Sequence, residues 1–164
     1  MKKMRIELRA RTEHQVRIYF DRTRDEEIQR MCPQKAQTVE EAIADFRKTL
    51  EADANSFGRT VYADGKYVGD VWLYCIDEEE NADAMLSFCL FEKELWGRGI
   101  MTEAVRMFLE ETERRFSLRT VGAFTFVENR GSQRVLMKNG FVLQESFFED
   151  GRESGYFERR TGDI

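Results

Sequence analysis

The sequence has little histidine, proline and cysteine, and it lacks a long apolar run. Its single histidine, His14, argues against a histidine-rich metal site and against a Ser–His or Cys–His catalytic pair. The three cysteines, Cys32, Cys75 and Cys89, are odd in number and scattered, unlike a disulfide framework or a zinc site. No apolar segment approaches the roughly 20 residues of a membrane-spanning helix, and no signal peptide is visible. We therefore expect reduced thiols, a cytoplasmic location, no bound metal and no membrane partner.

Hydrophobic residues make up 41% of the 164 residues and charged residues 35%, a balance typical of a folded globular protein. The length suits one domain, so we expect residues 1–164 to form a single unit. The 31 acidic residues exceed the 26 basic ones, which gives a net charge of -5. This balance argues against nucleic acid as a partner and mildly favours cationic ligands. The sequence leaves a monomer and a homodimer open.

Hydrophobic periodicity predicts alternating strands and helices. The expected strands cover residues 4–10, 59–63, 67–76, 85–91 and 121–127, with two more on either side of Asp150-Gly151, and the expected helices cover residues 14–31, 39–52, 100–116 and 130–139. Asp64-Gly65 is typical of a type I′ hairpin turn, and Gly140 of a helix end. This order predicts a mixed α/β fold, with a largely antiparallel central sheet of about six to seven strands flanked by helices.

One segment joins a predicted strand to a long amphipathic helix through Gly97-Arg98-Gly99. Glycine allows a ligand to approach the backbone closely, and the first amides of a helix have no partner within the helix. With the helix dipole, these amides favour a pyrophosphate, and Arg98 adds a positive side chain. The same pattern also fits a tight strand-to-helix turn without a ligand, so both interpretations stay open on this segment alone.

A second segment, Asn-Arg-Gly-Ser-Gln-Arg-Val-Leu-Met-Lys-Asn-Gly-Phe, covers residues 129–141 and follows another predicted strand. By itself it fits a helix that Asn129 caps and Gly140 ends. In their order and spacing, the two segments resemble the GNAT superfamily of acetyl-CoA-dependent N-acetyltransferases. The first is similar to the Q/R-x-x-G-x-G/A motif of that family, and the second to its Asn-x-x-Ser/Ala…Gly-Phe motif. Residues 96–104 are most similar to the ribosomal-protein N-terminal acetyltransferase-like (RimJ/RimL-like) branch.

The resemblance implies the GNAT fold, acetyl-CoA as co-substrate, no metal, and direct attack by a primary amine in a ternary complex. It implies that the cofactor is bound by Cys89, Leu90, Phe91, Trp96, Gly97, Arg98, Gly99, Ile100, Met101, Thr102, Asn129 and Ser132. Two positions depart from the family pattern. Glu94 stands where the motif has Gln or Arg, and Leu136 stands where many members have a tyrosine that protonates the departing thiolate.

The chemistry requires a base for the substrate ammonium and a proton donor for the thiolate. Glu92, at the end of the expected cofactor strand, is the predicted base, and Asp83 is the second candidate. Ser132 is the expected partner of the thiolate, because the family branch can use a serine there, and Tyr156 is the alternative. Each also fits an ordinary structural role: a solvated acid, a helix serine bonded to backbone, or a buried sheet tyrosine.

The acceptor is not identified by the sequence. The family branch favours the amine of a protein N-terminus, whereas the acidic balance and the cluster over residues 77–83 equally suit a polyamine or an aminosugar antibiotic. That cluster also fits a solvated turn. Trp72 and Tyr74 fit either the wall of an acceptor slot or core packing.

Two readings without catalysis remain. The missing tyrosine allows a module that binds acyl-CoA but does not react. The strand over residues 122–127 faintly resembles the aromatic strand of an RNA-recognition motif, but Ala123 and Thr125 break the match and the acidic charge opposes it.

Overall fold

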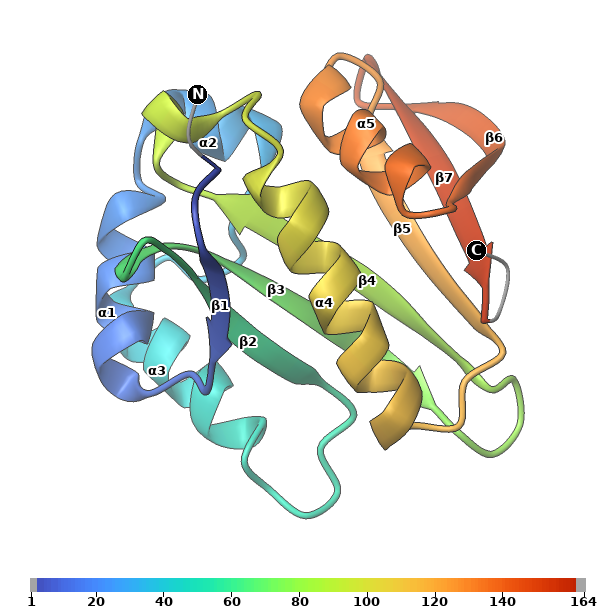
Figure 1. Cartoon of the computed structure of the whole chain (residues 1–164), viewed down its shortest axis with the longest axis horizontal. Coiled ribbons are helices and arrows are strands. Elements are labelled where there is room, and N and C mark those ends of the chain that lie inside the picture. The colour runs from blue at the N-terminus through green and yellow to red at the C-terminus, as the bar shows by residue number, and fades with distance from the viewer. Residues whose placement is uncertain (1–2, 162–164) are drawn as a thin grey trace.

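The computed structural model describes residues 3–161, whose seven strands form one sheet in the order β1-β2-β3-β4-β5-β7-β6 (Figure 1). The elements are β1 (Ile6–Arg9), α1 (Glu13–Arg22), α2 (Glu26–Met31), α3 (Val39–Lys48), β2 (Phe57–Ala63), β3 (Lys66–Asp77), β4 (Asp83–Leu90), the 3-10 helix η1 (Lys93–Leu95), α4 (Ile100–Arg115), β5 (Thr120–Phe126), α5 (Arg130–Lys138), β6 (Val142–Glu149) and β7 (Arg152–Arg160). All neighbouring strands are antiparallel except β4 and β5, which are parallel. The predicted mixed, largely antiparallel sheet is therefore confirmed.

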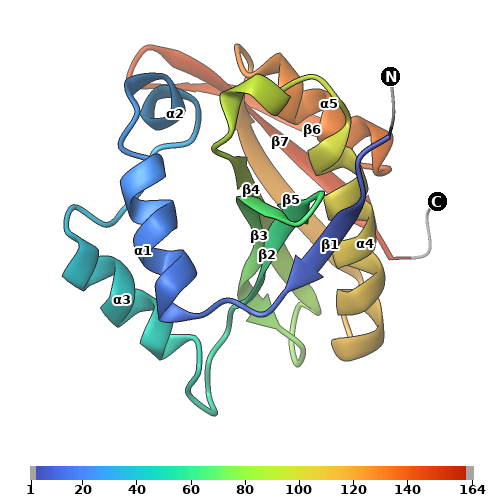
Figure 2. The ribbon, with the colours of Figure 1, turned by 60° about the vertical axis from the view of Figure 1, so that its left-hand side comes forward.

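Helices cover both faces of this sheet. α1, α2 and α3 lie on one face, and α4 and α5 lie on the other (Figure 2). α4 buries Ala104, Val105 and Phe108 completely in the main core, which also contains Leu73 and Leu86 of the sheet. Each large apolar side chain buried in this way contributes about 1.5–3 kcal/mol, so the start of α4 is held firmly against the sheet. In the described part of the chain, no helix has the length and apolar character to cross a membrane.

The helix expected over residues 14–31 is instead two helices, α1 and α2. The Thr23 hydroxyl donates to the carbonyl of Tyr19 at 2.6 Å where α1 ends, and the Asp25 carboxylate accepts from the amide of Ile28 at 3.1 Å where α2 begins. An aspartate side chain that caps a new helix offers the backbone an alternative to continuing the old one. α3 ends at Lys48, four residues before the expected end, and the Thr49 hydroxyl bonds back to the Phe46 carbonyl.

The turn predicted at Asp64-Gly65 and the helix end predicted at Gly140 are confirmed. Asp64 and Gly65 both have positive φ, 49° and 82°, as a type I′ turn requires. The Thr38 hydroxyl accepts from the amide of Glu41 at 3.1 Å and caps α3. Gly140 follows α5 with a φ of 85°, in the left-handed region where glycine is favoured.

The parallel pair of β4 and β5 is short, and this creates the site. Only the residues from Asp83 to Met85 pair with those from Thr120 to Gly122. Beyond them β4 runs on to Leu90 with β3 alone, while β5 runs on with β7. The two strands diverge toward the end of the sheet where α4 begins (Figure 1), so β4 presents unpaired backbone groups to the space between them.

Candidate active site

Two cavities lie where β4 and β5 diverge. The large cavity, of about 710 Å³, extends along β4 to the start of α4 and to α5, and the small cavity, of about 400 Å³, lies between β4, β5 and the β6–β7 hairpin. Five residues line both cavities, and we call them the junction: Met31, Cys32, Phe88, Asn129 and Ser132. A ligand in one cavity therefore meets a ligand in the other at the junction.

The Gly-x-Gly turn lies at one end of the large cavity. Gly97 and Gly99 have φ values of 80° and 78°, and a Cβ atom at either would meet no protein atom within 4 Å. The first bond within α4 runs from the amide of Glu103 to the carbonyl of Gly99, so the amides of residues 100–102 have no partner inside the helix. These three residues line the large cavity. Unpaired amides and the positive end of the helix dipole suit an anionic group there.

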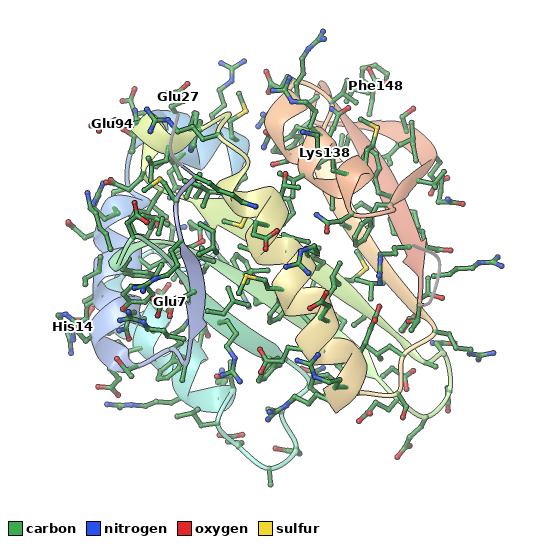
Figure 3. All side chains as sticks on the ribbon, in the orientation of Figure 1. Glu7, His14, Glu27, Glu94, Lys138 and Phe148 are labelled. Carbon is green, nitrogen blue, oxygen red and sulfur yellow. The ribbon has the colours of Figure 1, made fainter. Side chains whose placement is uncertain are left out.

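The opposite wall of the large cavity carries positive charge. Arg130, Arg134 and Lys138 recur four residues apart on α5 and line the cavity, and Figure 3 labels Lys138 on this helix. Glu128 is the one acidic residue among the lining residues, and it is ion-paired with Arg30 and Arg152. The cavity is therefore electropositive although the chain carries a net charge of -5, and it fits a polyanion.

Most of the predicted cofactor residues come together in the large cavity. Those that line it are Cys89, Leu90, Trp96, Gly97, Gly99, Ile100, Met101, Thr102, Asn129 and Ser132. Phe91 is buried in a cluster with Ile28 and Tyr67, and Arg98 is exposed; neither lines a cavity. The Trp96 indole donates to the carbonyl of Leu90 at 2.7 Å and thereby fixes the turn to the unpaired edge of β4.

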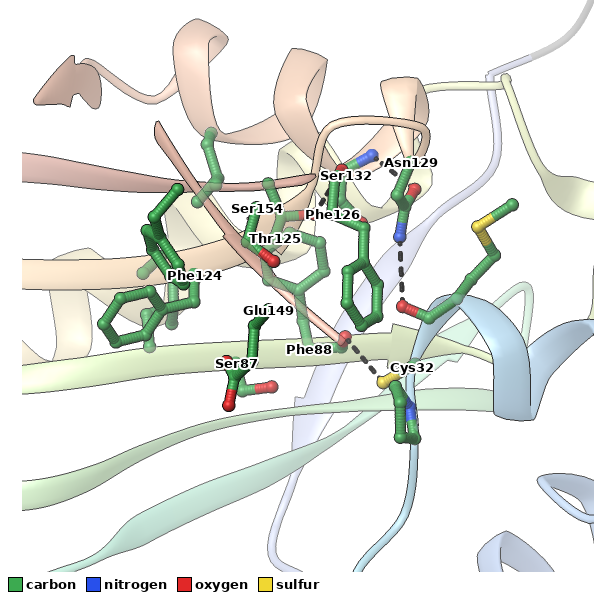
Figure 4. A pocket seen from close by; sticks show the side chains of 16 residues that line it. Cys32, Ser87, Phe88, Phe124, Thr125, Phe126, Asn129, Ser132, Glu149 and Ser154 are labelled. Atoms are coloured by element: carbon green, nitrogen blue, oxygen red, sulfur yellow. Dashed lines mark hydrogen bonds between the residues drawn. The ribbon is translucent and has the colours of Figure 1, made fainter. Parts of the chain in front are cut away.

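Hydrogen bonds hold the junction together. The Asn129 side chain accepts from the amide of Ser132 at 3.2 Å, as the cap of α5, and donates to the carbonyl of Met31 at 3.5 Å. The Cys32 thiol donates to the carbonyl of Phe88 at 3.8 Å (Figure 4). The end of α2, the free edge of β4 and the start of α5 are thus fixed around Ser132.

The structure does not bring Glu92 next to Ser132. The Glu92 carboxylate is ion-paired with Arg22 at the end of α1 and with Lys66 at the start of β3, and 12% of its side chain is exposed. It lines neither cavity. In this position Glu92 ties α1 to the end of β4.

The alternative candidates also lie away from the junction. Asp83 pairs with Thr120 at the closed end of the two strands. The Tyr156 hydroxyl donates to Glu158 at 3.0 Å, and burial together with this bond raises the pKa of Tyr156 to about 12. Trp72 packs edge-on against Tyr19 of α1 with ring centroids 6.3 Å apart, which is a core contact.

Three further sequence features are outside the cavities. Tyr74, like Trp72, does not line either of them. Glu94, where the sequence departs from the family motif, is exposed in η1, and His14 is exposed on α1 (Figure 3). Leu136, which replaces the tyrosine of many family members, is 1% exposed and contributes to the wall of the small cavity.

Sequence reasoning missed the residues that define the small cavity. Phe124, Phe126, Phe147 and Glu149 line it, and Figure 4 labels Phe124, Phe126 and Glu149. Aromatic faces and a carboxylate are suited to a cationic group. The alternation of Phe124 and Phe126 along β5 was a visible signal, but Phe147 and Glu149 reach the site only through the fold of the β6–β7 hairpin. In residues 3–161 no cluster of His, Cys, Asp and Glu is arranged to hold a metal.

Comparison with known proteins gives a family match over most of the chain. A family model described as an acetyltransferase (GNAT) domain matches residues 5–142. The sequence is 34% identical over 100 residues to the probable N-acetyltransferase YjcK of Bacillus subtilis (strain 168), a match that covers 60% of this chain. The match spans 55% of the length of that relative, so about half of the relative is represented.

Solved structures share the fold at low sequence identity. RimL, a ribosomal protein alpha-N-acetyltransferase in complex with coenzyme A, has a TM-score of 0.79 at 19% identity and covers 97% of this chain and 96% of its own. The aminoglycoside acetyltransferase AAC(6')-Ib in complex with coenzyme A has a TM-score of 0.79 at 16% identity, covering 96% and 95%. A chimera of the spermidine N-acetyltransferase SpeG from Vibrio cholerae has a TM-score of 0.79 at 18% identity, covering 94% and 95%.

Proposed function

This chain belongs to the acetyltransferase (GNAT) domain family, and we propose that it transfers an acetyl group from acetyl-CoA to a primary amine. The observation that carries this proposal is the junction, where an electropositive cavity meets an aromatic cavity that contains a carboxylate. A polyanionic acyl donor and a cationic acceptor can approach one another there from opposite sides. Direct transfer needs such a meeting point and no covalent enzyme intermediate.

The residues of the large cavity fit acetyl-CoA. The amides of residues 100–102 and the open space over Gly97 and Gly99 suit the pyrophosphate. The cationic row on α5 suits further phosphate charge, and the unpaired edge of β4 near Leu90 suits the amide groups of the pantetheine arm. When bound, acetyl-CoA supplies an acetyl group activated as a thioester.

We assign the leaving-thiolate role to Ser132, because it lines both cavities at the start of α5. Its hydroxyl would donate to the sulfur atom that departs. The base that accepts the ammonium proton, directly or through water, is best matched by Glu149, the one carboxylate among the residues lining the small cavity. Glu92 stays the prediction from sequence, and its ion pairs with Arg22 and Lys66 make it the less accessible carboxylate.

For the acceptor we propose the α-amine of a protein N-terminus. The small cavity offers one carboxylate, Glu149, beside the rings of Phe124, Phe126 and Phe147, which matches a single ammonium with apolar neighbours. A polyamine or an aminoglycoside carries several positive charges and would need several carboxylates. The solved relatives named above act on all three kinds of amine, so the test must include each kind.

The test is a steady-state assay for free coenzyme A thiol over a panel of amines. We expect turnover with peptides that have a free N-terminus and none with the same peptides acetylated beforehand. Turnover confined to spermidine or an aminoglycoside would overturn the acceptor assignment but keep the acetyltransferase. Tight acetyl-CoA binding without turnover on any amine would instead indicate a non-catalytic binding module.

A further inference from the structure

Cys32 lies where the two cavities meet. It follows directly on α2 and is one of the five junction residues that line both cavities. Its sulfur atom donates to the carbonyl of Phe88 at 3.8 Å (Figure 4). The side-chain amide of Gln34 donates to the same sulfur atom at 3.4 Å. The thiol is therefore fixed in place at the junction, where the proposed function puts the sulfur atom of coenzyme A.

Two more polar groups adjoin this thiol. Cys89 lines the large cavity, and hydrogen bonds from Cys89 and from Gln34 lower the pKa of the Cys32 thiol although burial opposes the effect. The Tyr19 hydroxyl is buried and has no hydrogen-bond partner among residues 3–161. Burial raises the pKa of Tyr19, and the neighbouring thiols of Cys89 and Cys32 raise it further. Cys32, which is half-buried, thus lies beside a buried hydroxyl that has no hydrogen-bond partner among the described residues.

We propose that Cys32 is a site of covalent modification by coenzyme A, through exchange with coenzyme A disulfide. This inference rests on the proposed function, because it requires the nucleotide part of the ligand to occupy the large cavity. The Cys32 thiolate attacks one sulfur atom of the disulfide, a new S–S bond joins Cys32 to that coenzyme A, and the original S–S bond breaks. The second coenzyme A leaves as a thiolate and takes a proton from water, so no further oxidant is needed.

The adduct would close the site. A coenzyme A joined to Cys32 occupies the junction, so neither acetyl-CoA nor an amine can reach Ser132. Reduction by a thiol would release it. The chain also contains an internal reference, because Cys75 on β3 is exposed and lines neither cavity. A disulfide that reacts without using the large cavity should also modify the exposed Cys75, and a ligand in that cavity should not block it.

The experiment is intact-mass analysis and peptide mapping after incubation of the full chain with coenzyme A disulfide. We expect one coenzyme A per chain on Cys32, a rate that saturates with concentration, and complete removal by dithiothreitol. Desulfo-coenzyme A should protect Cys32 but not Cys75, and Cys32→Ser should lose the directed adduct. Hydroxyethyl disulfide, which lacks the nucleotide, should show neither saturation nor protection at Cys32.

Other outcomes overturn the inference. An adduct that forms as readily on Cys75, an adduct on Cys89, a Cys32–Cys89 disulfide in place of the adduct, or no protection by desulfo-coenzyme A would each do so. Calorimetry with acetyl-CoA separates this failure from that of the proposed function. If the wild-type protein binds acetyl-CoA but no directed adduct forms, only the modification is wrong. If the wild-type protein does not bind acetyl-CoA, the proposed function itself is wrong.

Discussion

Gly97 and Gly99 line the large cavity with positive φ and with open space at the position of a Cβ atom. We expect Gly99→Val to abolish acetyl-CoA binding, because the side chain would extend into the path of the pyrophosphate while the fold stays cooperative. Gly151→Val is a matched control, since Gly151 has a φ of 77°, the same open space and no place in the large cavity. Both variants should lose about 1–2 kcal/mol of stability from left-handed strain. If calorimetry finds equal acetyl-CoA affinity in the Gly99→Val and Gly151→Val variants, the pyrophosphate does not bind at Gly99.

Ser132 and Glu149 line the small cavity, whereas Glu92 does not. If the first two act mainly in the transition state, Ser132→Ala and Glu149→Gln should lower kcat, by about 100-fold or more for an acid or base without a substitute, and leave acetyl-CoA affinity unchanged. Glu92→Gln should have a smaller effect on kcat and should lower thermal stability, because Arg22 and Lys66 lose their shared partner. Loss of turnover in Glu92→Gln alone, with its stability intact, would restore Glu92 as the base.

The environment of Cys32 gives a pH dependence. Hydrogen bonds from Cys89 and Gln34 lower the pKa of the Cys32 thiol, so its thiolate forms at lower pH than it would without them. The rate of Cys32 alkylation by iodoacetamide should therefore rise with pH through the pKa of this thiol. Cys89→Ala removes the larger cause, and the midpoint should move to higher pH. Peptide mapping of the alkylated chain measures both midpoints, and identical midpoints would contradict the assignment.

Single residues differ in how well the sequence predicts them. The roles of Gly97 and Gly99 depend on backbone geometry within a few residues, and the sequence pattern predicted their place at the start of α4. The position of Glu92 depends on Arg22, 70 residues away, and on Lys66, 26 residues away. A local sequence pattern does not predict contacts between residues so far apart. The sequence therefore predicted that Glu92 lies at the end of a strand, but not its ion pairs.

Close contact between β3 and β4 determines the position of the unpaired edge. A Cβ atom at Gly69 would lie 2.3 Å from the carbonyl oxygen of Cys89, a backbone atom that cannot yield without moving the strand. We expect Gly69→Ala to cost about 3 kcal/mol or more of the free energy of unfolding, at the upper end of the usual cost of overpacking, and to weaken acetyl-CoA binding. Gly131→Ala is the control for stability, because its nearest contact would be at 3.9 Å, and it should change stability by less than about 1 kcal/mol. Urea unfolding of the two variants measures the difference, and equal midpoints would contradict the prediction.

Whole elements were more predictable than the contacts between them. Periodicity and turn residues predicted every strand and most helices, and the one division that they missed, between α1 and α2, depends on the cap at Asp25. The hairpin at Asp150-Gly151 was also predicted, and both residues have positive φ. The order of β5, β7 and β6 in the sheet determines where this hairpin places Phe147 and Glu149 relative to β5. The small cavity was therefore not predictable from local pattern.

Occupation of the large cavity should be visible in the stability of the whole molecule. Acetyl-CoA at a hundredfold over its dissociation constant stabilises a folded protein by about 2.7 kcal/mol, which corresponds to a rise in Tm of about 5–11 °C for a chain of this size. The shift should be the same with and without EDTA. Differential scanning calorimetry measures it, with acetate as the ligand control. The absence of a shift at millimolar acetyl-CoA, with titration calorimetry also silent, would refute acetyl-CoA binding.

The short pairing of β4 with β5 leaves few backbone hydrogen bonds at the centre of the sheet. Among the described residues, β4 pairs with β5 at three positions. The side chain of Asn139, which follows α5, also donates to the carbonyl of Thr102 in α4 at 3.1 Å. An extended ligand arm along the free edge of β4 would form the backbone hydrogen bonds that a neighbouring strand would otherwise provide. Bound ligand would thereby add backbone bonds across the gap, beside the core that Leu136 and Phe157 already share with Phe108 of α4.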